Sequence, residues 1–372
     1  MVRGAWLWLG LVWLAGCNLV LPLSGRPGDA SPQGDSWSSA EAPPLPDGPL
    51  PVDGPTALGC QQLVLAEGPG ALRGVWGGWP ASPDVIAVGD GGRILHYNPD
   101  ALTVAELGSG SSIILGLEDV WFTSLSDVRM AGGDQLDNRR YLHWDGAVLT
   151  PVSLAGATDP GTMRGIACGG NGDCYMVGTG RRFFYLFSPP LGWVSDNLAA
   201  TPPAADLNGV AVTSDGLAVA VGNGGVVTVV AYDRDSKGWV QHKYTETSTF
   251  GDLMDVWIVE APGVIHLVIA SRAGKLLVLK LERSNWALTP EAEHPAPAPL
   301  NGVFGVGKRA YAVGDLGTIL ACDLPGGDAQ LTCDVVQSGV TEDLLAVWAR
   351  GTAAPNLFVA GASATFLHCR PL

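Results

Sequence analysis

A pattern of about 45 residues recurs seven times after residue 60, and this repeat constrains the fold more than any other feature of the chain. Each copy begins with a small or acidic residue, continues with valine or isoleucine, and in most copies then has an aromatic residue. The central residues of the seven copies, separated by steps of 44 to 47 residues, are Val75, Val120, Ile166, Val210, Val256, Val303 and Val347. This period lies in the range of β-propeller blades.

Each copy also carries the signals for four strands. The first pattern is followed by an apolar run that ends in glycine, as at 85–92 (VIAVGDGG) and 218–225 (AVAVGNGG). Glycine accepts the positive φ of a tight turn. A third strand follows, as at 93–98 (RILHYN), and a more polar fourth strand ends the unit, as at 239–244 (WVQHKY). The repeat therefore predicts an all-β fold, a seven-bladed β-propeller of four-stranded antiparallel blades.

The two ends of the repeat region predict how the ring closes. The last copy stops after its third strand, at 365–372 (TFLHCRPL), and the segment 60–68 (CQQLVLAEG) has no blade of its own. If this N-terminal segment joins the last blade as its outer strand, no long sheet edge is left unpaired. We therefore expect the propeller domain to span residues 60–372.

The cores of two copies, VGDGGRILH at 88–96 and VGDLGTIL at 313–320, resemble those of a broad group of bacterial propellers. This group includes the photosystem II assembly-factor type and the sialidase-like proteins with BNR or Asp-box repeats. The resemblance covers the whole repeat region and implies the propeller fold. It implies no single activity, because propellers carry unrelated functions.

Residues 1–16 have the features of a secretory signal, with one arginine near the start and a short apolar run. The sequence LAGC at 14–17 resembles the lipobox of bacterial lipoproteins, which implies lipidation of Cys17, for example by palmitate. The alternative is an ordinary signal with a chance cysteine. Asn18 follows the cysteine, and the resemblance then implies the outer membrane of a Gram-negative bacterium, on its periplasmic or surface face. Residues 17–59 are rich in Pro, Gly and Ser, which predicts a tether.

Six cysteines remain besides Cys17, an even number that favours disulfides in an exported protein. Blade topology selects one pairing among the many possible. The expected pairs are Cys168 with Cys174 across a hairpin turn, Cys322 with Cys333 on neighbouring strands, and Cys60 with Cys369 where the ring closes. Metal binding is the alternative, but no C-x-x-C pair occurs, and we expect no metal or other cofactor.

Tryptophans and histidines recur at fixed places in the repeat. Most tryptophans after the tether lie in first strands or near fourth strands, and His96, His143 and His368 share one place in third strands. Recurrence at one phase predicts packing between blades. A sugar-stacking site for the tryptophans and a metal site for the histidines are the alternatives.

The sequence contains no complete catalytic motif. G-x-S-x-G, H-E-x-x-H and phosphate-binding loops are absent, and a match to the Asp box, DRDSKGW at 233–239, is degenerate. The arginine motif of true sialidases has no counterpart. With 36 acidic and 21 basic residues the net charge is −15, so no nucleic-acid partner is expected. These features predict a protein that is not an enzyme.

Three aspartates, Asp90, Asp134 and Asp315, follow the glycine of the second strand and share one turn. One interpretation is that each side chain bonds the backbone of its own turn. The other is an acidic rim on the face that carries these turns, favouring basic partners or cations. Further aspartates that would join such a rim are Asp119, Asp252, Asp255 and Asp343.

Four arginines come from matching turns of two adjacent blades: Arg139, Arg140, Arg181 and Arg182. One interpretation is that they are solvated or pair with Asp134 and Asp137. The functional hypothesis is a cationic patch for a partner that bears carboxylates, such as an acidic surface polysaccharide or an acidic protein segment. Phe183 and Tyr185 on the next strand would then supply apolar contact.

Together these features predict a non-enzymatic, lipid-anchored propeller that acts as a binding or scaffolding module at the bacterial envelope. Its partner would be an envelope protein or an acidic surface polysaccharide, its membrane contact would be the lipid anchor alone, and it would be a monomer. The alternative is a carbohydrate-active propeller, either a lectin or a sialidase-like glycoside hydrolase.

Overall fold

A computed structural model of the chain describes residues 57–65, 70–78, 82–107, 114–134, 138–152, 154, 161–170, 172–187, 192–195, 205–324, 331–352 and 354–372. The signal, Cys17 and the predicted tether up to residue 56 lie outside the described residues.

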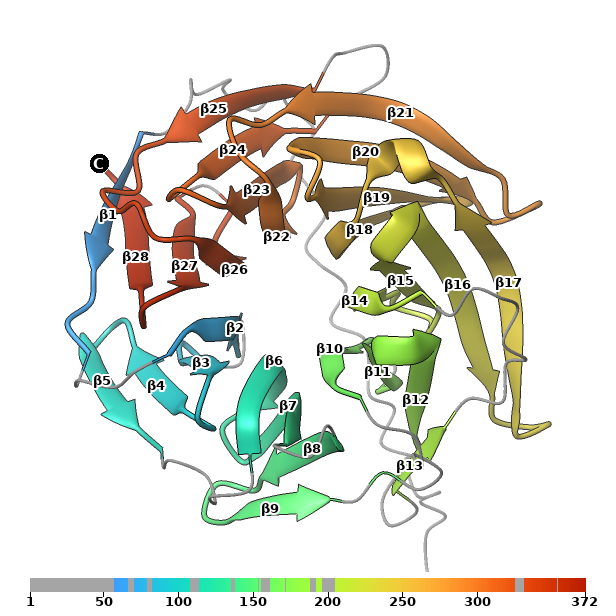
Figure 1. Cartoon of the computed structure of the whole chain (residues 1–372), viewed down its shortest axis with the longest axis horizontal. Coiled ribbons are helices and arrows are strands. Elements are labelled where there is room, and N and C mark those ends of the chain that lie inside the picture. The colour runs from blue at the N-terminus through green and yellow to red at the C-terminus, as the bar shows by residue number, and fades with distance from the viewer. Residues whose placement is uncertain are drawn as a thin grey trace, which may run out of the picture. The chain divides into compact units, whose positions relative to one another are not determined.

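Seven antiparallel sheets of four strands are arranged around a common axis as the blades of a propeller (Figure 1). Two cavities lined by the inner strands lie along this axis, and we call the space that contains them the channel. The inner strands are β2 (Leu72–Gly77), β6 (Ile114–Ser124), β10 (Met163–Cys168), β14 (Leu207–Val212), β18 (Leu253–Ala261), β22 (Leu300–Val306) and β26 (Leu344–Arg350). The second strands are β3 (Val85–Gly89), β7 (Asp127–Asp134), β11 (Cys174–Gly178), β15 (Ala218–Gly222), β19 (Val264–Ser271), β23 (Arg309–Gly314) and β27 (Asn356–Gly361).

The outer half of each blade completes the sheet. The third strands are β4 (Ile94–Asn98), β8 (Arg139–Trp144), β12 (Arg182–Phe187), β16 (Val226–Asp233), β20 (Lys275–Glu282), β24 (Ile319–Asp323) and β28 (Phe366–Pro371). The fourth strands are β5 (Thr103–Glu106), β9 (Leu149–Val152), β13 (Gly192–Ser195), β17 (Gly238–Glu246), β21 (Leu288–Pro295), β25 (Thr332–Val336) and β1 (Leu58–Gln62). The described helical elements are single 3₁₀ turns, namely η1 (Thr179–Arg181), η2 (Asn223–Gly225) and η3 (Ser248–Phe250). Blades one to six follow in chain order from β2, and blade seven consists of β26, β27, β28 and β1.

The N-terminal strand closes the ring, as the sequence predicts. β1 pairs antiparallel with β28, and Cys60 lies opposite Cys369 in the register. Figure 1 shows β1 beside β28 although the two strands come from opposite ends of the chain. The closure leaves blade seven with the same four strands as the others, and its third strand is not an open edge.

Seven clusters of buried apolar side chains hold the ring together, and each cluster lies between two neighbouring blades. The recurring tryptophans contribute to these interfaces. Trp348, which is 3% exposed, packs from blade seven against the cluster that contains Leu72 of blade one. Trp239 packs from blade four against Tyr175 of blade three. Packing between blades thus accounts for the recurrence.

The glycine that ends the second strand serves a purpose different from the expected one. Gly178 and Gly222 have extended backbones, with φ of −171° and −165°. A Cβ atom on either would lie 2.2 Å from the carbonyl oxygen of Thr162 or 2.0 Å from that of Asp206, in the loop that enters the inner strand. Glycine is therefore needed here for close approach. The positive φ of the turn lies two residues later, as at Gly224 with φ of 70°.

The six cysteines of the propeller form the three expected pairs, namely Cys60 with Cys369, Cys168 with Cys174, and Cys322 with Cys333. The first pair ties the closing strand to the end of the chain across 309 residues. The other two join strands that are already neighbours within blades three and six.

Of the three recurring histidines, His368 contacts a neighbouring blade as the packing interpretation predicts, whereas His96 and His143 each pair with an aspartate of their own blade. His96 Nε2 lies 2.7 Å from Asp84 Oδ1, and His143 Nε2 lies 2.8 Å from Asp127 Oδ1. His368 is 3% exposed and contacts the Tyr97 hydroxyl at 2.9 Å. Within the described residues no group of three or more His, Cys, Asp or Glu side chains is placed to hold a metal ion.

Candidate functional site

A β-bulge interrupts every inner strand at the same end of the channel. The pairing of inner and second strands shifts by one residue there in all seven blades, for example between Leu72 and Gly74. A bulge leaves one residue out of the ladder and redirects its side chain. The bulged residues line a cavity of about 380 Å³, which we call the mouth; they are Arg73, Glu118, Arg164, Asn208, Met254, Asn301 and Leu345.

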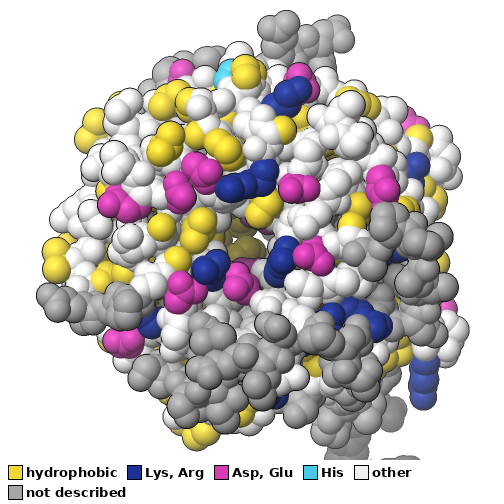
Figure 2. All heavy atoms as spheres, in the orientation of Figure 1, with side chains coloured by type: hydrophobic (Ala, Val, Ile, Leu, Met, Phe, Trp, Pro, Cys, Tyr) yellow, Lys and Arg dark blue, Asp and Glu magenta, His cyan; other side chains and the backbone are white. Residues whose placement is uncertain are grey.

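Carboxylates from neighbouring segments hold the two mouth arginines. Arg73 Nε donates to Asp90 Oδ1 at 2.6 Å, and Arg73 Nη1 lies 3.8 Å from Glu118 Oε2 in the next blade. Arg164 pairs with Asp206 at 3.0 Å. The Arg73 and Arg164 side chains remain 39% and 34% exposed. Figure 2 shows basic and acidic side chains gathered around a central hollow.

Two mouth asparagines join neighbouring blades. Asn208 Nδ2 donates to the carbonyl of Leu253 at 2.8 Å, and Asn301 Nδ2 donates to the carbonyl of Leu344 at 2.9 Å. Asn301 also donates to Asp315 Oδ1 at 2.8 Å. These bonds orient the amide groups at the mouth before any ligand arrives.

The charges at the mouth differ in how firmly they are held. Burial alone would raise the pKa of Asp90, but hydrogen bonds from Arg73 and from the Ala71 N–H outweigh it, so the pKa is lowered. Burial raises the pKa of Glu118 in spite of Arg73 and Arg164 nearby. Asp90 therefore stays ionised down to a lower pH than usual, whereas Glu118 takes up a proton more readily than usual.

Two aspartates, Asp119 and Asp255, lie deeper in the channel, directly after the bulged residues. The other five blades have glycine or alanine at this place. Asp119 Oδ2 accepts the N–H of Ile166 in blade three at 2.8 Å, and Asp255 Oδ2 accepts the N–H of Val303 in blade six at 2.9 Å. Each carboxylate also accepts the N–H of the residue that follows it at 2.8 Å.

Burial dominates the proton affinity of this pair. It raises the pKa of Asp119 to about 8, the charge of Asp255 adds to the rise, and the hydrogen bond from the Ile166 N–H reduces it. Burial also raises the pKa of Asp255 to about 6, against the hydrogen bonds from Val303 and Val256. The channel thus holds two carboxyl groups that take up protons near neutral pH.

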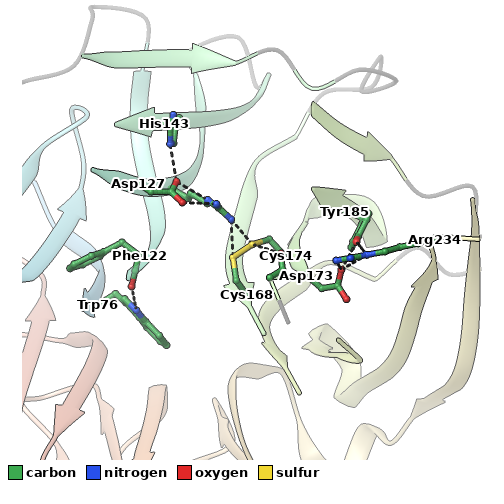
Figure 3. Close-up of a disulfide and its surroundings, with 11 residues drawn as sticks. Trp76, Phe122, Asp127, His143, Cys168, Asp173, Cys174, Tyr185 and Arg234 are labelled. Carbon is green, nitrogen blue, oxygen red and sulfur yellow. Dashed lines mark hydrogen bonds and ion pairs between the residues drawn. A yellow bond between two sulfur atoms is a disulfide. The ribbon is translucent and has the colours of Figure 1, made fainter. Parts of the chain in front are cut away.

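Beyond these aspartates the channel becomes aromatic. A second cavity of about 340 Å³ is lined by Asp119 and Asp255 together with Trp76, Trp121, Trp257 and Phe304. We call it the aromatic compartment. Trp76 Nε1 donates to the carbonyl of Phe122 at 3.0 Å, which fixes the indole against blade two (Figure 3).

Two aspartates of the predicted acidic rim, Asp252 and Asp343, form hydrogen bonds that hold the scaffold together. Asp252 Oδ1 accepts the N–H of Gly224 at 2.8 Å, and Asp343 Oδ1 accepts that of Leu316 at 3.1 Å. Both bonds tie a loop that enters an inner strand to the turn of the preceding blade. The side chain of Asp134 lies outside the described residues.

Asp90 and Asp315 lie next to the mouth, but neither bonds the backbone of its own turn. Asp90 Oδ2 accepts the N–H of Ala71 at 2.9 Å in the loop that enters β2. Asp315 Oδ1 accepts from Arg272 Nη1 at 2.9 Å as well as from Asn301. The region is therefore one of mixed charge, because each aspartate is paired with an arginine.

The structure buries two of the four arginines of the hypothesised patch, Arg139 and Arg181, and leaves Arg140 and Arg182 half-buried. Arg139, Arg140 and Arg182 belong to strands β8 and β12 rather than to free turns. Arg139 is only 4% exposed, and its Nη2 donates to the carbonyl of Thr179 in blade three at 2.9 Å. The predicted partner Asp137 lies outside the described residues.

Arg181 is also turned into the structure. It is 6% exposed, and its Nη2 donates to Gln241 Oε1 at 2.9 Å. Its guanidinium carbon lies 4.1 Å from the ring centroid of Tyr244 in blade four. Arg139 and Arg181 each link their own blade to the next one, and this structural use buries them.

Tyr185 cannot offer the apolar contact that we expected, because it is 1% exposed and Phe183 is fully buried. The Tyr185 hydroxyl donates a hydrogen bond to the Asp173 carboxylate and accepts one from Arg234 Nε at 2.7 Å. Figure 3 shows these three side chains converging between blades three and four, near the disulfide of Cys168 and Cys174. They are an internal network of the scaffold.

No protein-family model matches the sequence, and no curated protein matches it. Solved structures do match: YCF48 from Cyanidioschyzon merolae has a TM-score of 0.58 and 16% identity over 83% of this chain and 98% of that one. A structure titled YCF48 bound to D1 peptide has a TM-score of 0.59 and 14% identity over 85% and 97% of the chains. The Cps50 (Swd1) β-propeller domain of Myceliophteria thermophila has a TM-score of 0.61 and 11% identity over 84% and 100%. These similarities show the propeller fold.

Sequence reasoning missed the mouth residues. They occupy the place directly before the small or acidic residue that opens each copy of the repeat. The seven residues there are of five types: Arg, Glu, Arg, Asn, Met, Asn and Leu. The signal that could have identified the mouth residues is a repeat position that varies among the blades next to a position that is nearly the same in all of them. The described part of the chain contains no helix long and apolar enough to cross a membrane.

Proposed function

We propose that this chain is a non-catalytic binding propeller, anchored by a lipid on Cys17 to the outer membrane, and that its ligand is a segment of an envelope protein bound at the mouth. The observation that carries the proposal is the set of bulged residues, which brings guanidinium, carboxylate and amide groups from neighbouring blades into one cavity. Their hydrogen bonds hold them in place in advance, which reduces the entropy cost of binding.

The mixed charge favours a protein segment over an acidic polysaccharide. A polymer with carboxylates alone would meet Arg73 and Arg164 but also Asp90, Glu118 and Asp206. A peptide carries charges of both signs, and its backbone supplies donors and acceptors for the mouth amides. One propeller of similar fold has been solved with a peptide bound.

The test compares an Arg73→Gln, Arg164→Gln double variant with wild type and with an Arg309→Gln control. Arg309 forms an exposed ion pair with Asp323 away from the mouth. Each protein is used to capture partners from envelope extract across a salt series, after equal melting temperatures have been shown. We expect the double variant to lose a specific protein by about tenfold, since charge-assisted hydrogen bonds are worth about 1.5–3 kcal/mol, while the control retains it.

Three results would contradict the proposal. They are equal capture by the wild type and the double variant, retention of acidic polysaccharide in place of protein, and turnover of a panel of chromogenic glycosides.

A further inference from the structure

The aromatic compartment has an asymmetric wall. The third repeat position of the inner strand is aromatic in five blades, but it is Ala167 in blade three and Ala211 in blade four. Because these two alanines are neighbours, the ring of aromatic side chains has one gap. Both alanines line the cavity of about 340 Å³.

The aromatic side chains around this gap are fixed by the scaffold. The ring centroids of Trp76 and Phe304 lie 5.4 Å apart at an interplanar angle of 85°, and those of Trp76 and Trp121 lie 6.4 Å apart. Trp257 lies against Gly305, where a Cβ atom would come within 2.3 Å of the indole. All four side chains are partly exposed, so they combine fixed positions with surface open to the cavity.

Every charged residue that lines the compartment within the described part of the chain is acidic: Asp119, Asp255 and Glu260. Arg283 pairs with Glu260 at 3.0 Å. Arg129 lies 5.6 Å from the Trp121 ring centroid, but it is not among the lining residues.

Aromatic faces and carboxylates share one preference, which is for positive charge. A cation over an indole or phenyl face is attracted by the negative face of the ring. A primary ammonium also needs acceptors for three N–H groups. Here each oxygen of Asp119 and Asp255 already accepts one backbone N–H and has one lone pair left for a second donor. A cation without N–H groups avoids that requirement.

We propose that the aromatic compartment binds a quaternary ammonium group, with the tryptophans and Phe304 around its methyl groups and Asp119 and Asp255 at its inner end. This site adjoins the mouth, whose lining also includes Asp119 and Asp255, but its aromatic wall does not line the mouth. The proposal does not rest on the function proposed for the mouth. The group can belong to a small solute such as choline or to a trimethylated lysine of a partner protein.

The proton affinity of the carboxyl pair makes the proposed binding pH-dependent. A bound cation favours the ionised forms, whereas burial raises the pKa of Asp119 to about 8 and that of Asp255 to about 6. The other charged groups that face the pair are Arg73, Glu118 and Arg164 from the mouth and Glu260 from the aromatic side. Binding therefore releases protons, and affinity rises as the pH increases.

The experiment is isothermal titration of the full chain in a maltoside detergent with choline and with its neutral isostere 3,3-dimethylbutanol. We expect choline to bind at least about tenfold more tightly, which corresponds to about 1.4 kcal/mol. We also expect its affinity to rise from about pH 6 to about pH 9 with proton release, and that of the isostere to stay level. An N-acetyl trimethyllysine amide in a parallel titration distinguishes a partner side chain from a free solute. Equal binding of choline and its isostere, or no binding of either cation, would overturn the proposal.

An Ala211→Phe variant tests whether choline binds in the aromatic compartment. Five other blades carry an aromatic side chain at this position, so we expect the variant to fold, which its melting temperature checks, and to lose choline binding by at least tenfold. Val240→Phe, on the exposed outer strand β17, adds the same side chain elsewhere and serves as the control. Choline binding that survives the substitution would refute this location. The mouth variant should bind choline no more weakly than wild type, because it removes two positive charges that face the carboxyl pair. Loss of protein capture together with retained choline binding separates this test from that of the proposed function.

Discussion

Asp119 and Asp255 stand where the repeat otherwise uses the smallest residues. The structure accommodates them because each carboxylate bridges to the next inner strand and accepts a backbone N–H there. Burying a carboxyl group is costly in its charged form, and the group responds by binding a proton more tightly. This single-residue departure from the repeat makes the channel sensitive to pH.

We predict that Asp119 lowers stability as the pH rises from about 4 to about 8. Its pKa is raised to about 8 in the folded protein, and about 3.9 is usual for an unfolded chain. Between these values the folded state holds a proton that the unfolded state has released, so the free energy of unfolding falls with increasing pH. Urea unfolding of wild type and Asp119→Asn at several pH values tests this. The variant should gain stability relative to wild type between pH 5 and pH 8, and parallel curves would contradict the raised pKa.

At the scale of single elements, the short strand β1 closes the propeller ring. Its five residues complete blade seven by pairing with β28, and its Cys60 bonds to Cys369. The strand therefore acts together with a covalent link that spans nearly the whole propeller. The other two disulfides close short loops within one blade.

We predict that the closure disulfide stabilises the fold more than the other two. Constraint of the unfolded chain grows with the length of the loop that is closed, so loss of the closure disulfide should cost about 5–6 kcal/mol, against about 2 kcal/mol for the hairpin bond. The comparison uses Cys60→Ala, Cys369→Ala and Cys168→Ala, Cys174→Ala double variants in urea unfolding. An equal loss in both variants would show that loop length does not determine the effect.

At the scale of the whole molecule, a rigid ring is joined to a segment of very different composition. The seven interfaces between blades leave little freedom inside the propeller. The segment before it is rich in Pro, Gly and Ser, and its composition predicts a tether. Our proposal is a binding surface displayed at a distance from a membrane.

Lipid anchoring can be tested on the intact protein in its host. Several acyl chains on Cys17 would give stable membrane attachment, since two lipid signals already suffice. We therefore predict that Cys17→Ser moves most of the protein from the membrane fraction to the fraction extracted without detergent. Quantitative immunoblotting of both fractions measures this, and equal membrane retention of the two forms would refute anchoring through Cys17.

The sequence by itself determined the seven blades, the closing strand and the cysteine pairs. These features follow from local alternation and from a period of about 45 residues, which are visible without knowing how blades face one another. The burial and the partners of single side chains depended on how the blades pack in the ring. The sequence pattern assigned Arg139 and Arg181 to turns, but the next blade buries both side chains.

Only the tertiary structure revealed the channel. Arg73 and Arg164 are 91 residues apart in the sequence, yet bulges in different blades direct both side chains into one mouth. The same holds for Asp119 and Asp255, whose proton affinity comes from burial that neither segment could produce alone. A repeat records what all blades share, whereas a site at their common axis is built from the places where they differ.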